Sequence, residues 1–268
     1  MNKVFGFIGT GNMGGALARA ASKVVAADNM LLSDSYSPVA ENLAQELGCK
    51  AVTVTTVAVS ADFIWLGVKP QVMESLLKDI GPYLASRTEP FVLVSMAAGM
   101  SIKDIRRMAG GDYPVIRIMP NIPVKAGNGV ILYDVSENVG QDALDVFRWS
   151  MTYAGLVDRI PEKLIDAGSA LSGCGPAFVS LFVDALADGA VACGLPRAQA
   201  ILYAEQTLMG TAKYLLENGV HPGQLKDAVC SPGGSTIAGV LAMENSAFRA
   251  ATAEAVVAAY EKTLELGK

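Results

Sequence analysis

The stretch of residues 225 to 237, LKDAVCSPGGSTI, interrupts a helix-forming part of the chain with Ser231-Pro232-Gly233-Gly234. Successive backbone N–H groups at the start of a helix form a concave anion site, and glycines let a ligand approach the backbone. A carboxylate fits such a site without any arginine, and Thr236 adds a hydroxyl at its mouth. The alternative is that Ser235 or Thr236 only caps its own helix. The residues alone leave both interpretations open.

A second candidate loop, Gly9-Thr10-Gly11-Asn12-Met13-Gly14, follows the apolar run Val4–Ile8 and opens the helical run Gly15–Val25. Glycines at these positions permit a tight turn, close approach of the backbone to a pyrophosphate, and close contact between helix and strand. The position between a strand and a helix predicts dinucleotide binding. A glycine-rich turn that binds nothing is the alternative.

Asp34 closes the second predicted strand, about twenty residues after Gly14. An acidic side chain at this place accepts a hydrogen bond from the 2'-hydroxyl of NAD and repels the 2'-phosphate of NADP. Ser33, Ser35 and Ser37 surround it, and their hydroxyls are able to donate to a phosphate instead. The cofactor preference is therefore open at this point.

Three further loops follow predicted strands at the edge where open α/β sheets bind ligands. They are Val68-Lys69-Pro70, Ser95-Met96-Ala97-Ala98-Gly99 and Met119-Pro120-Asn121-Ile122-Pro123. Lys69 either faces a nicotinamide or ends its strand at the surface. The small residues after Ser95 either leave room for a flat ring or permit a tight turn, and Asn121 either orients a substrate or fixes the turn.

Groups for strong acid catalysis are scarce in this sequence. No lysine lies between Lys163 and Lys213, and the one histidine, His221, stands in a helix-start signal with Pro222 and Gly223. Reduction of a ketone develops an alkoxide, which needs a well-placed acid. An imine nitrogen is protonated before reduction, so a threonine hydroxyl and bound water suffice. This scarcity favours an imine over a ketone as substrate.

The elements that would position these loops follow from hydrophobic patterning. Short β-branched runs alternate with helical segments over about the first 135 residues, a pattern typical of a parallel sheet with helices on both faces. The predicted strands are Val4–Ile8, Met30–Ser33, Ala51–Val52, Phe63–Val68, Phe91–Ser95, Val115–Met119 and Gly129–Tyr133. We expect an α/β domain over residues 1–160.

Residues 161–268 are predicted to form an all-helical domain, because Ala, Leu and Gly replace the β-branched runs from about Pro161. The predicted helices are Glu162–Leu171, Pro176–Cys193, Arg197–Asn218, Gly223–Val229, Thr236–Glu244 and Ser246–Leu266. Gly194, Gly219 and Gly267 are their stop signals.

Composition argues against several classes of function. The net charge of −5 with scattered basic residues gives no footprint for nucleic acid or an anionic membrane surface. The four cysteines form no CxxC pair and do not cluster with the histidine, which predicts neither a metal site nor disulfides and favours a reducing cytoplasm. The most apolar windows contain Asp62, Asp184 and Asp188, so we expect no membrane span.

With these motifs in place, the sequence resembles the pyrroline-5-carboxylate reductase family essentially from end to end. The resemblance rests on residues 7–14, 68–70, 97–99 and 171–177, and above all on residues 221–227 continuing through 231–237. It implies a Rossmann-type doubly wound sheet followed by a helical domain that dimerises and often assembles further into a decamer. It also implies NAD(P)H-dependent reduction of 1-pyrroline-5-carboxylate to L-proline, the last step of proline biosynthesis, by hydride transfer to the cyclic imine carbon.

The resemblance also implies roles for individual positions. Thr236 would be catalytic, hydrogen-bonding the ring nitrogen of the substrate. The substrate set is Val229, Ser231, Gly233, Gly234, Ser235 and Thr236. The cofactor set, with Asp34 added from its place after the second strand, is Ile8, Gly9, Thr10, Gly11, Asn12, Met13, Asp34, Ser35, Gly67, Val68, Lys69, Pro70, Met96, Ala97 and Ala98. NADP is the expected cofactor, with NAD as the alternative.

Three residues depart from the family pattern. Ile122 stands where threonine is usual, Cys174 where serine is common, and Asp34 at the 2'-position although most relatives favour NADPH. Two rival functions also stand: a reductase of the same architecture that acts on 3-hydroxy acids or another cyclic imine, and a dinucleotide sensor without catalysis. The 3-hydroxy-acid enzymes would place a lysine on the long helix after the sheet domain, whereas residues 164–212 contain none.

Overall fold

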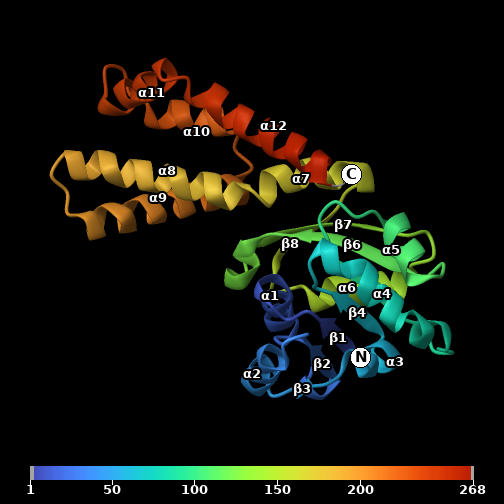
Figure 1. Cartoon of the computed structure of the whole chain (residues 1–268). Coiled ribbons are helices and arrows are strands. Elements are labelled where there is room, and N and C mark those ends of the chain that lie inside the picture. The colour runs from blue at the N-terminus through green and yellow to red at the C-terminus, as the bar shows by residue number, and fades with distance from the viewer. Residues whose placement is uncertain (1–2, 267–268) are drawn as a thin grey trace. The chain divides into compact units, whose positions relative to one another are not determined.

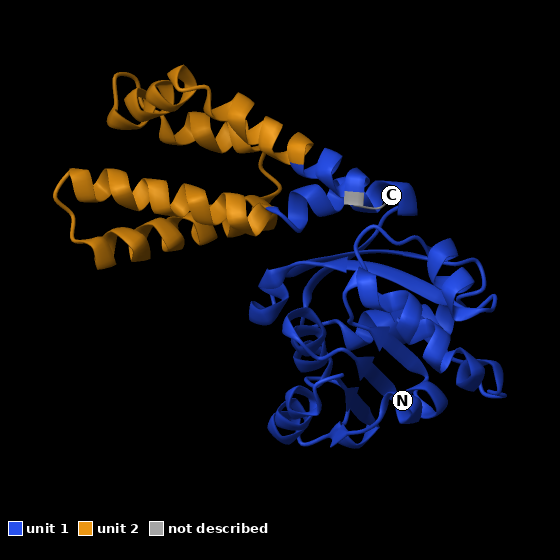
Figure 2. Ribbon diagram, in the orientation of Figure 1, with its two compact units in different colours: residues 1–174, 259–268 blue, residues 175–258 orange. Residues whose placement is uncertain are grey.

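The structure is a computed structural model that describes residues 3–266 (Figure 1). Its contacts divide the chain into two compact units, Met1–Cys174 with Ala259–Lys268, and Gly175–Ala258 (Figure 2). The first unit contains the sheet, and the second is made of helices.

An eight-stranded sheet in the order β3-β2-β1-β4-β5-β6-β7-β8 organises the first unit. Its strands are β1 (Phe5–Ile8), β2 (Met30–Ser33), β3 (Lys50–Ala51), β4 (Phe63–Leu66), β5 (Val92–Ser95), β6 (Val115–Pro120), β7 (Gly129–Val135) and β8 (Gly155–Arg159). Neighbouring strands are parallel except β6 and β7. The strand order reverses at β1, where ligands bind in sheets of this kind.

Helices cover both faces of this sheet. They are α1 (Asn12–Ala21), α2 (Ser37–Leu47), α3 (Val54–Ser60), α4 (Pro70–Ala85), α5 (Ile102–Ala109), α6 (Gln141–Ser150) and α7 (Glu162–Ser172), with 3-10 turns η1 (Ala27–Asn29) and η2 (Ile122–Ala126). One core packs α1, α2 and α6 against side chains such as Phe7 and Trp65. The other packs α3, α4 and α5 against Ile64 and Leu66 on the opposite face. The predicted doubly wound architecture is confirmed.

The seven predicted strands are present, and none of their ends shifts by more than two residues. The range Phe63–Val68 was too long, because β4 ends at Leu66 and Gly67 already belongs to the turn. The eighth strand, β8, was missed. It is a mostly exposed edge strand with the sequence GLVDR, so it lacks both the apolar run of a buried strand and a regular alternation.

The second unit consists of α8 (Gly175–Ala192), α9 (Arg197–Asn218), α10 (Pro222–Val229), α11 (Ser235–Asn245) and most of α12 (Phe248–Leu266). Helices α8 and α9 pack side by side, with an ion pair of 2.6 Å between Arg197 and Asp188. The predicted helices are confirmed within two residues at each end. Gly194 and Gly219 have φ values of +96° and +62°, as stop signals require, whereas Gly267 lies outside the described residues.

Apolar side chains of the second unit are largely exposed in the single chain. Leu181 is 72% exposed and Leu216 is 85% exposed, while the buried residues of α8 and α9 are alanines such as Ala187 and Ala200. Apolar helices that bury no stripe of large side chains within their own chain normally bury these side chains against another chain. By length and composition alone, the stretch Glu162–Ala192 is also apolar enough to cross a membrane, so Asp184 and Asp188 do not exclude a span, contrary to the expectation from the sequence.

Candidate functional site

The loop from Gly9 to Gly14 joins the end of β1 to the start of α1 and packs against the turn after β4. Gly9 has a φ of +86°, and a Cβ there would lie 2.7 Å from the carbonyl group of Gly67. A Cβ on Gly14 or Gly67 would overlap the carbonyl oxygen of Gly9. These three positions therefore need glycine so that the two loops can approach each other.

Gly11 differs from its neighbours because its Cβ would meet nothing within 4 Å. It is the N-cap of α1, a helix with no side-chain cap and no acidic residue in its first turn. The N–H groups of that turn and the positive end of the helix dipole are thus available to an anion, and only a glycine leaves the backbone bare. This cradle fits a pyrophosphate.

The carboxylate of Asp34, just after β2, holds this loop in place. Its Oδ2 accepts a hydrogen bond of 2.8 Å from the backbone N–H of Thr10, and its Oδ1 accepts one of 3.1 Å from the N–H of Tyr36. Thr10 is almost completely buried, so its N–H depends on this acceptor. Asp34 therefore has a structural role in addition to the predicted ribose contact.

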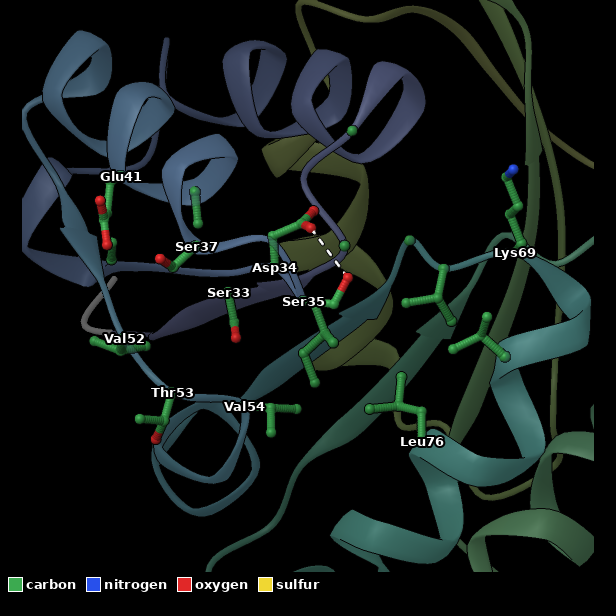
Figure 3. Close-up of a pocket in the computed structure, with 18 residues that line it drawn as sticks. Ser33, Asp34, Ser35, Ser37, Glu41, Val52, Thr53, Val54, Lys69 and Leu76 are labelled. Carbon is green, nitrogen blue, oxygen red and sulfur yellow. Dashed lines mark hydrogen bonds between the residues drawn. The ribbon is translucent and has the colours of Figure 1, made fainter.

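A cavity of about 800 Å³ opens beside this loop (Figure 3). Eight predicted cofactor residues line it: Ile8, Gly9, Gly11, Asp34, Ser35, Gly67, Val68 and Lys69. Thr10, Asn12, Met13, Pro70, Met96, Ala97 and Ala98 are outside its lining. The sequence thus placed the ends of β1, β2 and β4 correctly at one cavity, and the cofactor role of each residue stays a prediction.

Several lining residues were not among the predicted site residues. They are Ala40, Glu41, Ala51, Val52, Thr53, Val54, Val72 and Leu76, whereas Ser33 and Ser37, which also line the cavity, were identified from the sequence as candidate phosphate donors. Ala40 and Glu41 lie near the start of α2, and Thr53 and Val54 begin α3, which the parallel order β3-β2-β1 brings to the same edge as the glycine loop. The signal that would have found them is this shared edge, since the loops after neighbouring parallel strands meet there.

Charges are distributed unevenly around the cavity. Figure 3 shows Asp34, Ser35, Ser37 and Glu41 on the opposite side from Lys69. The two serines stand at the start of α2, whose N-terminus has no side-chain cap and no acidic residue in its first turn. Hydroxyls and a helix N-terminus favour a phosphate there, whereas Asp34 and Glu41 disfavour one.

Local hydrogen bonds hold the loops after β5 and β6 and indicate the roles of their residues. Ala97 is buried and donates its N–H to the hydroxyl of Ser95 at 3.4 Å, while Ala98 is exposed. The side chain of Asn121 donates to the carbonyl of Ser172 at 2.9 Å and accepts from the N–H of Val130 at 2.8 Å. Asn121 therefore fixes the turn and anchors the end of α7, which supports the second of its two interpretations.

The loop of Ser231 to Gly234 lies between α10 and α11 in the helical unit. The N–H of Gly234 donates to the carbonyl of Ser231 at 3.0 Å, with Pro232 and Gly233 between them and a φ of +69° at Gly233. This is the residue pattern of a type II turn. A side chain at Gly233 would be strained, and one at Gly234 would lie 2.5 Å from the Ser231 hydroxyl oxygen.

The N-terminus of α11 has no side-chain cap in this structure. Gly234 is the N-cap, and neither Ser235 nor Thr236 bonds back to the first turn. The capping alternative is therefore absent here, and the exposed N–H groups of this turn are available to an anion. Ser231, Ser235 and Thr236 are exposed beside it, and Val229 is 56% exposed.

Within residues 3–266, no group of three or more His, Cys, Asp or Glu side chains lies close enough together to hold a metal ion. The four cysteines are free thiols. Burial raises the pKa of the Cys49 thiol, so this cysteine is less reactive than an exposed one.

Comparisons with known proteins cover the whole chain. Residues 162–266 match the family model described as pyrroline-5-carboxylate reductase dimerisation, and residues 4–99 match the one described as NADP oxidoreductase coenzyme F420-dependent. The chain is 39% identical to the pyrroline-5-carboxylate reductase of Escherichia coli, over 100% of both chains. It is 37% identical to that of Methanosarcina acetivorans, over 100% of this chain and 99% of the relative.

Solved structures agree with these matches. A Plasmodium falciparum pyrroline carboxylate reductase with NADP bound aligns with a TM-score of 0.88 and 30% identity, covering 100% of this chain and 99% of the other. A pyrroline-5-carboxylate reductase from Coxiella burnetii aligns with a TM-score of 0.92 and 27% identity over 100% of both chains.

Proposed function

Because this chain belongs to the pyrroline-5-carboxylate reductase family, we propose that it reduces 1-pyrroline-5-carboxylate to L-proline, the last step of proline biosynthesis. One hydride and one proton add across the C=N bond of the cyclic imine, and the reduced nicotinamide is oxidised. The observation that carries this proposal is the uncapped N-terminus of α11 behind Gly233 and Gly234, since the resemblance assigns the substrate to these residues.

The dinucleotide is proposed to bind in the cavity beside Gly11, with NADP(H) as cofactor and NAD(H) as the alternative. The bare cradle at α1 and the serine hydroxyls at α2 support a phosphorylated nucleotide. The Plasmodium falciparum relative has NADP bound, which supports the same choice. When bound, the nicotinamide supplies the hydride.

The substrate carboxylate is proposed to accept hydrogen bonds from the N–H groups of the first turn of α11. Ser231, Gly233, Gly234 and Ser235 form this anion site, and Val229 packs against the apolar ring. Thr236 is proposed to hydrogen-bond the ring nitrogen and to keep its proton in place. A protonated imine needs no further acid, so orientation accounts for most of the rate.

Assembly is proposed to be a homodimer through the helical domain, with the boundary between the domains near residue 160. The match of residues 162–266 to a dimerisation model and the exposed leucines of α8 and α9 support this arrangement. A decamer built from such dimers is the larger alternative. We propose that a second copy covers the apolar stretch Glu162–Ala192, that the enzyme is cytoplasmic, and that it has no membrane or nucleic-acid partner.

The test measures the oxidation of NADPH and of NADH with 1-pyrroline-5-carboxylate as substrate. The loss of nicotinamide absorbance reports the rate, and the product is identified as proline. Matched reactions contain a 3-hydroxy acid with the oxidised cofactor, or another cyclic imine. We expect turnover with 1-pyrroline-5-carboxylate and little with the others. Cofactor binding without oxidation would instead identify a dinucleotide sensor, and preference for another substrate would reject the proposal.

A further inference from the structure

Helix α10, which leads into the Ser231–Gly234 turn, begins at an unusual N-cap. His221 has an extended backbone, with φ −65° and ψ 136°, and its ring Nδ1 accepts a hydrogen bond of 3.1 Å from the N–H of Gly223. The side chain of Gln224 accepts one of 3.3 Å from the N–H of His221 in return. Ser, Thr, Asp and Asn usually supply this reciprocal arrangement, so the histidine calls for an explanation.

Only one form of the His221 ring makes this contact. A ring nitrogen that accepts a hydrogen bond carries no proton, so the form that caps α10 is the neutral imidazole with its proton on Nε2. A positive charge here would also face the positive end of the α10 dipole. The neutral ring therefore acts as a cap, and Nε2 keeps one N–H directed elsewhere.

Helix α10 depends on such a cap more than most helices. It has eight residues and none of them is buried within the chain. Helices this short are marginal without packing or capping. At the other end, the N–H of Cys230 bonds to the carbonyl of Asp227 at 3.2 Å, and Ser231 follows immediately.

A second local contact lies near that end. The ammonium of Lys226 donates to the carboxylate of Asp227, which raises the pKa of Lys226. Both side chains belong to neighbouring positions of α10, so this pair does not tie the helix to another element. Fraying that starts at His221 therefore has only about two turns to cross before it reaches the turn at Ser231.

We propose that His221 is a positioning residue for the anion-binding turn, acting through the Nδ1 cap of α10. It touches neither substrate nor cofactor in this role. With the cap made, α10 holds its last turn and the Ser231 carbonyl stays in place to accept from Gly234. Without it, α10 frays and the turn samples other conformations, so the substrate carboxylate meets a less ordered set of N–H groups. Only the expected effect on the kinetics with 1-pyrroline-5-carboxylate rests on the proposed function.

The experiment compares His221→Ala with His221→Asn in the full-length protein. Asparagine restores a side-chain acceptor at the N-cap, whereas alanine does not. We expect His221→Ala to raise the KM for 1-pyrroline-5-carboxylate by about fivefold, with kcat changed less than about twofold and an unaltered Kd for NADPH. His221→Asn should stay within about twofold of the unmodified protein in all three.

A second measurement does not depend on activity. Amide hydrogen exchange should be faster by about fivefold in residues 224–229 and in 235–237 of His221→Ala, and close to normal in His221→Asn. Gln224→Ala removes the reciprocal hydrogen bond and should also make amide exchange faster in both segments. This variant replaces His221→Ala in the experiment if His221→Ala does not fold.

Equal behaviour of the alanine and asparagine variants would overturn the proposal, as would faster exchange in α10 that leaves residues 235–237 unchanged. A protein that does not reduce 1-pyrroline-5-carboxylate at all would remove the proposed function. The exchange comparison would then still decide whether His221 orders the turn.

Discussion

The N–H of Thr10 lies 2.8 Å from the carboxylate of Asp34, so the residue expected to select the cofactor also holds the loop that is predicted to bind it. Thr10 is 4% exposed, so an N–H left there without an acceptor costs free energy. Asp34 thus contributes both negative charge at the cavity and an anchor for the adjacent loop. A substitution at Asp34 can remove its negative charge, its hydrogen-bond acceptor for Thr10, or both. Asparagine and alanine variants separate these two effects.

Asp34→Asn is expected to keep an oxygen for Thr10 while removing the negative charge. The affinity for NADPH relative to NADH should rise by about 1 kcal/mol, roughly fivefold, because one repulsive charge near the 2'-phosphate is lost. Asp34→Ala should weaken both cofactors by about 1–3 kcal/mol, since the Thr10 N–H loses its partner. Fluorescence titration with each nucleotide measures both effects. If the two variants show the same change in preference and affinity, Asp34 does not hold the loop.

Two glycine substitutions should separate packing from cofactor binding. Gly11→Ala places a methyl group in open space, so the melting temperature should stay close to normal while the Kd for NADPH rises about tenfold or more. Gly67→Ala forces a Cβ onto the Gly9 carbonyl and should lower the stability by about 1–3 kcal/mol or more. Thermal unfolding with and without NADPH distinguishes them. A Gly11→Ala protein with normal affinity would mean that the pyrophosphate does not approach this backbone.

Thr236→Ala should impair turnover without affecting cofactor binding. A hydrogen bond to a charged group contributes about 1.5–3 kcal/mol, so kcat/KM should fall roughly tenfold to a hundredfold. Thr236→Ser keeps the hydroxyl and should retain most of the rate. Steady-state kinetics and NADPH titration of the three proteins provide the comparison. Unchanged turnover in the alanine variant would remove Thr236 from the mechanism.

The sequence predicted most of the sheet because central strands are buried on both faces and appear as apolar runs. It failed at β8, whose exposed edge position imposes no such pattern on Gly155–Arg159. The glycine loop was found from its spacing together with its position between a predicted strand and a predicted helix, and Gly9 and Gly14 are required there by close backbone contacts. Glu41 and Thr53 were missed because their place at the cavity depends on strand order, which is a property of the folded chain.

Local chemistry was equally hard to predict where one residue had two possible roles. The sequence allows Asn121 either to orient a substrate or to fix its turn. Its hydrogen bonds with Ser172 and Val130 support the second role. Helix α3 illustrates a related limit: its sequence VTTVAVS favours a strand, yet Thr53 caps it through a hydrogen bond from the Thr56 N–H. Tertiary packing outweighs propensity at such positions.

Charged substitutions on the apolar helices should dissociate the assembly. Leu216 and Leu181 are 85% and 72% exposed in the single chain, so Leu216→Glu or Leu181→Glu should leave the first unit folded but shift the molar mass toward a monomer. Leu156→Glu is the matched control, because this leucine is 61% exposed on β8 of the first unit, outside the residues that match the dimerisation model. Light scattering coupled to gel filtration measures the mass. A dimer that tolerates both glutamates would place the interface elsewhere.

Arg117 should be the ion-pairing residue whose loss costs most stability in the first unit. Its side chain is 5% exposed and donates to Asp166 at 2.6 Å and to Glu162 at 3.4 Å, which ties α7 to strand β6. Arg117→Met leaves both carboxylates without their cation, and because these are partly exposed we expect a loss of about 2 kcal/mol in the free energy of unfolding. Arg159→Met is the control: its pair with Asp134 is 3.3 Å long and the Arg159 side chain is 48% exposed, so its loss should cost less than about 1 kcal/mol. Urea unfolding at one fixed protein concentration gives both values, and equal losses would show that burial does not strengthen the Arg117 network.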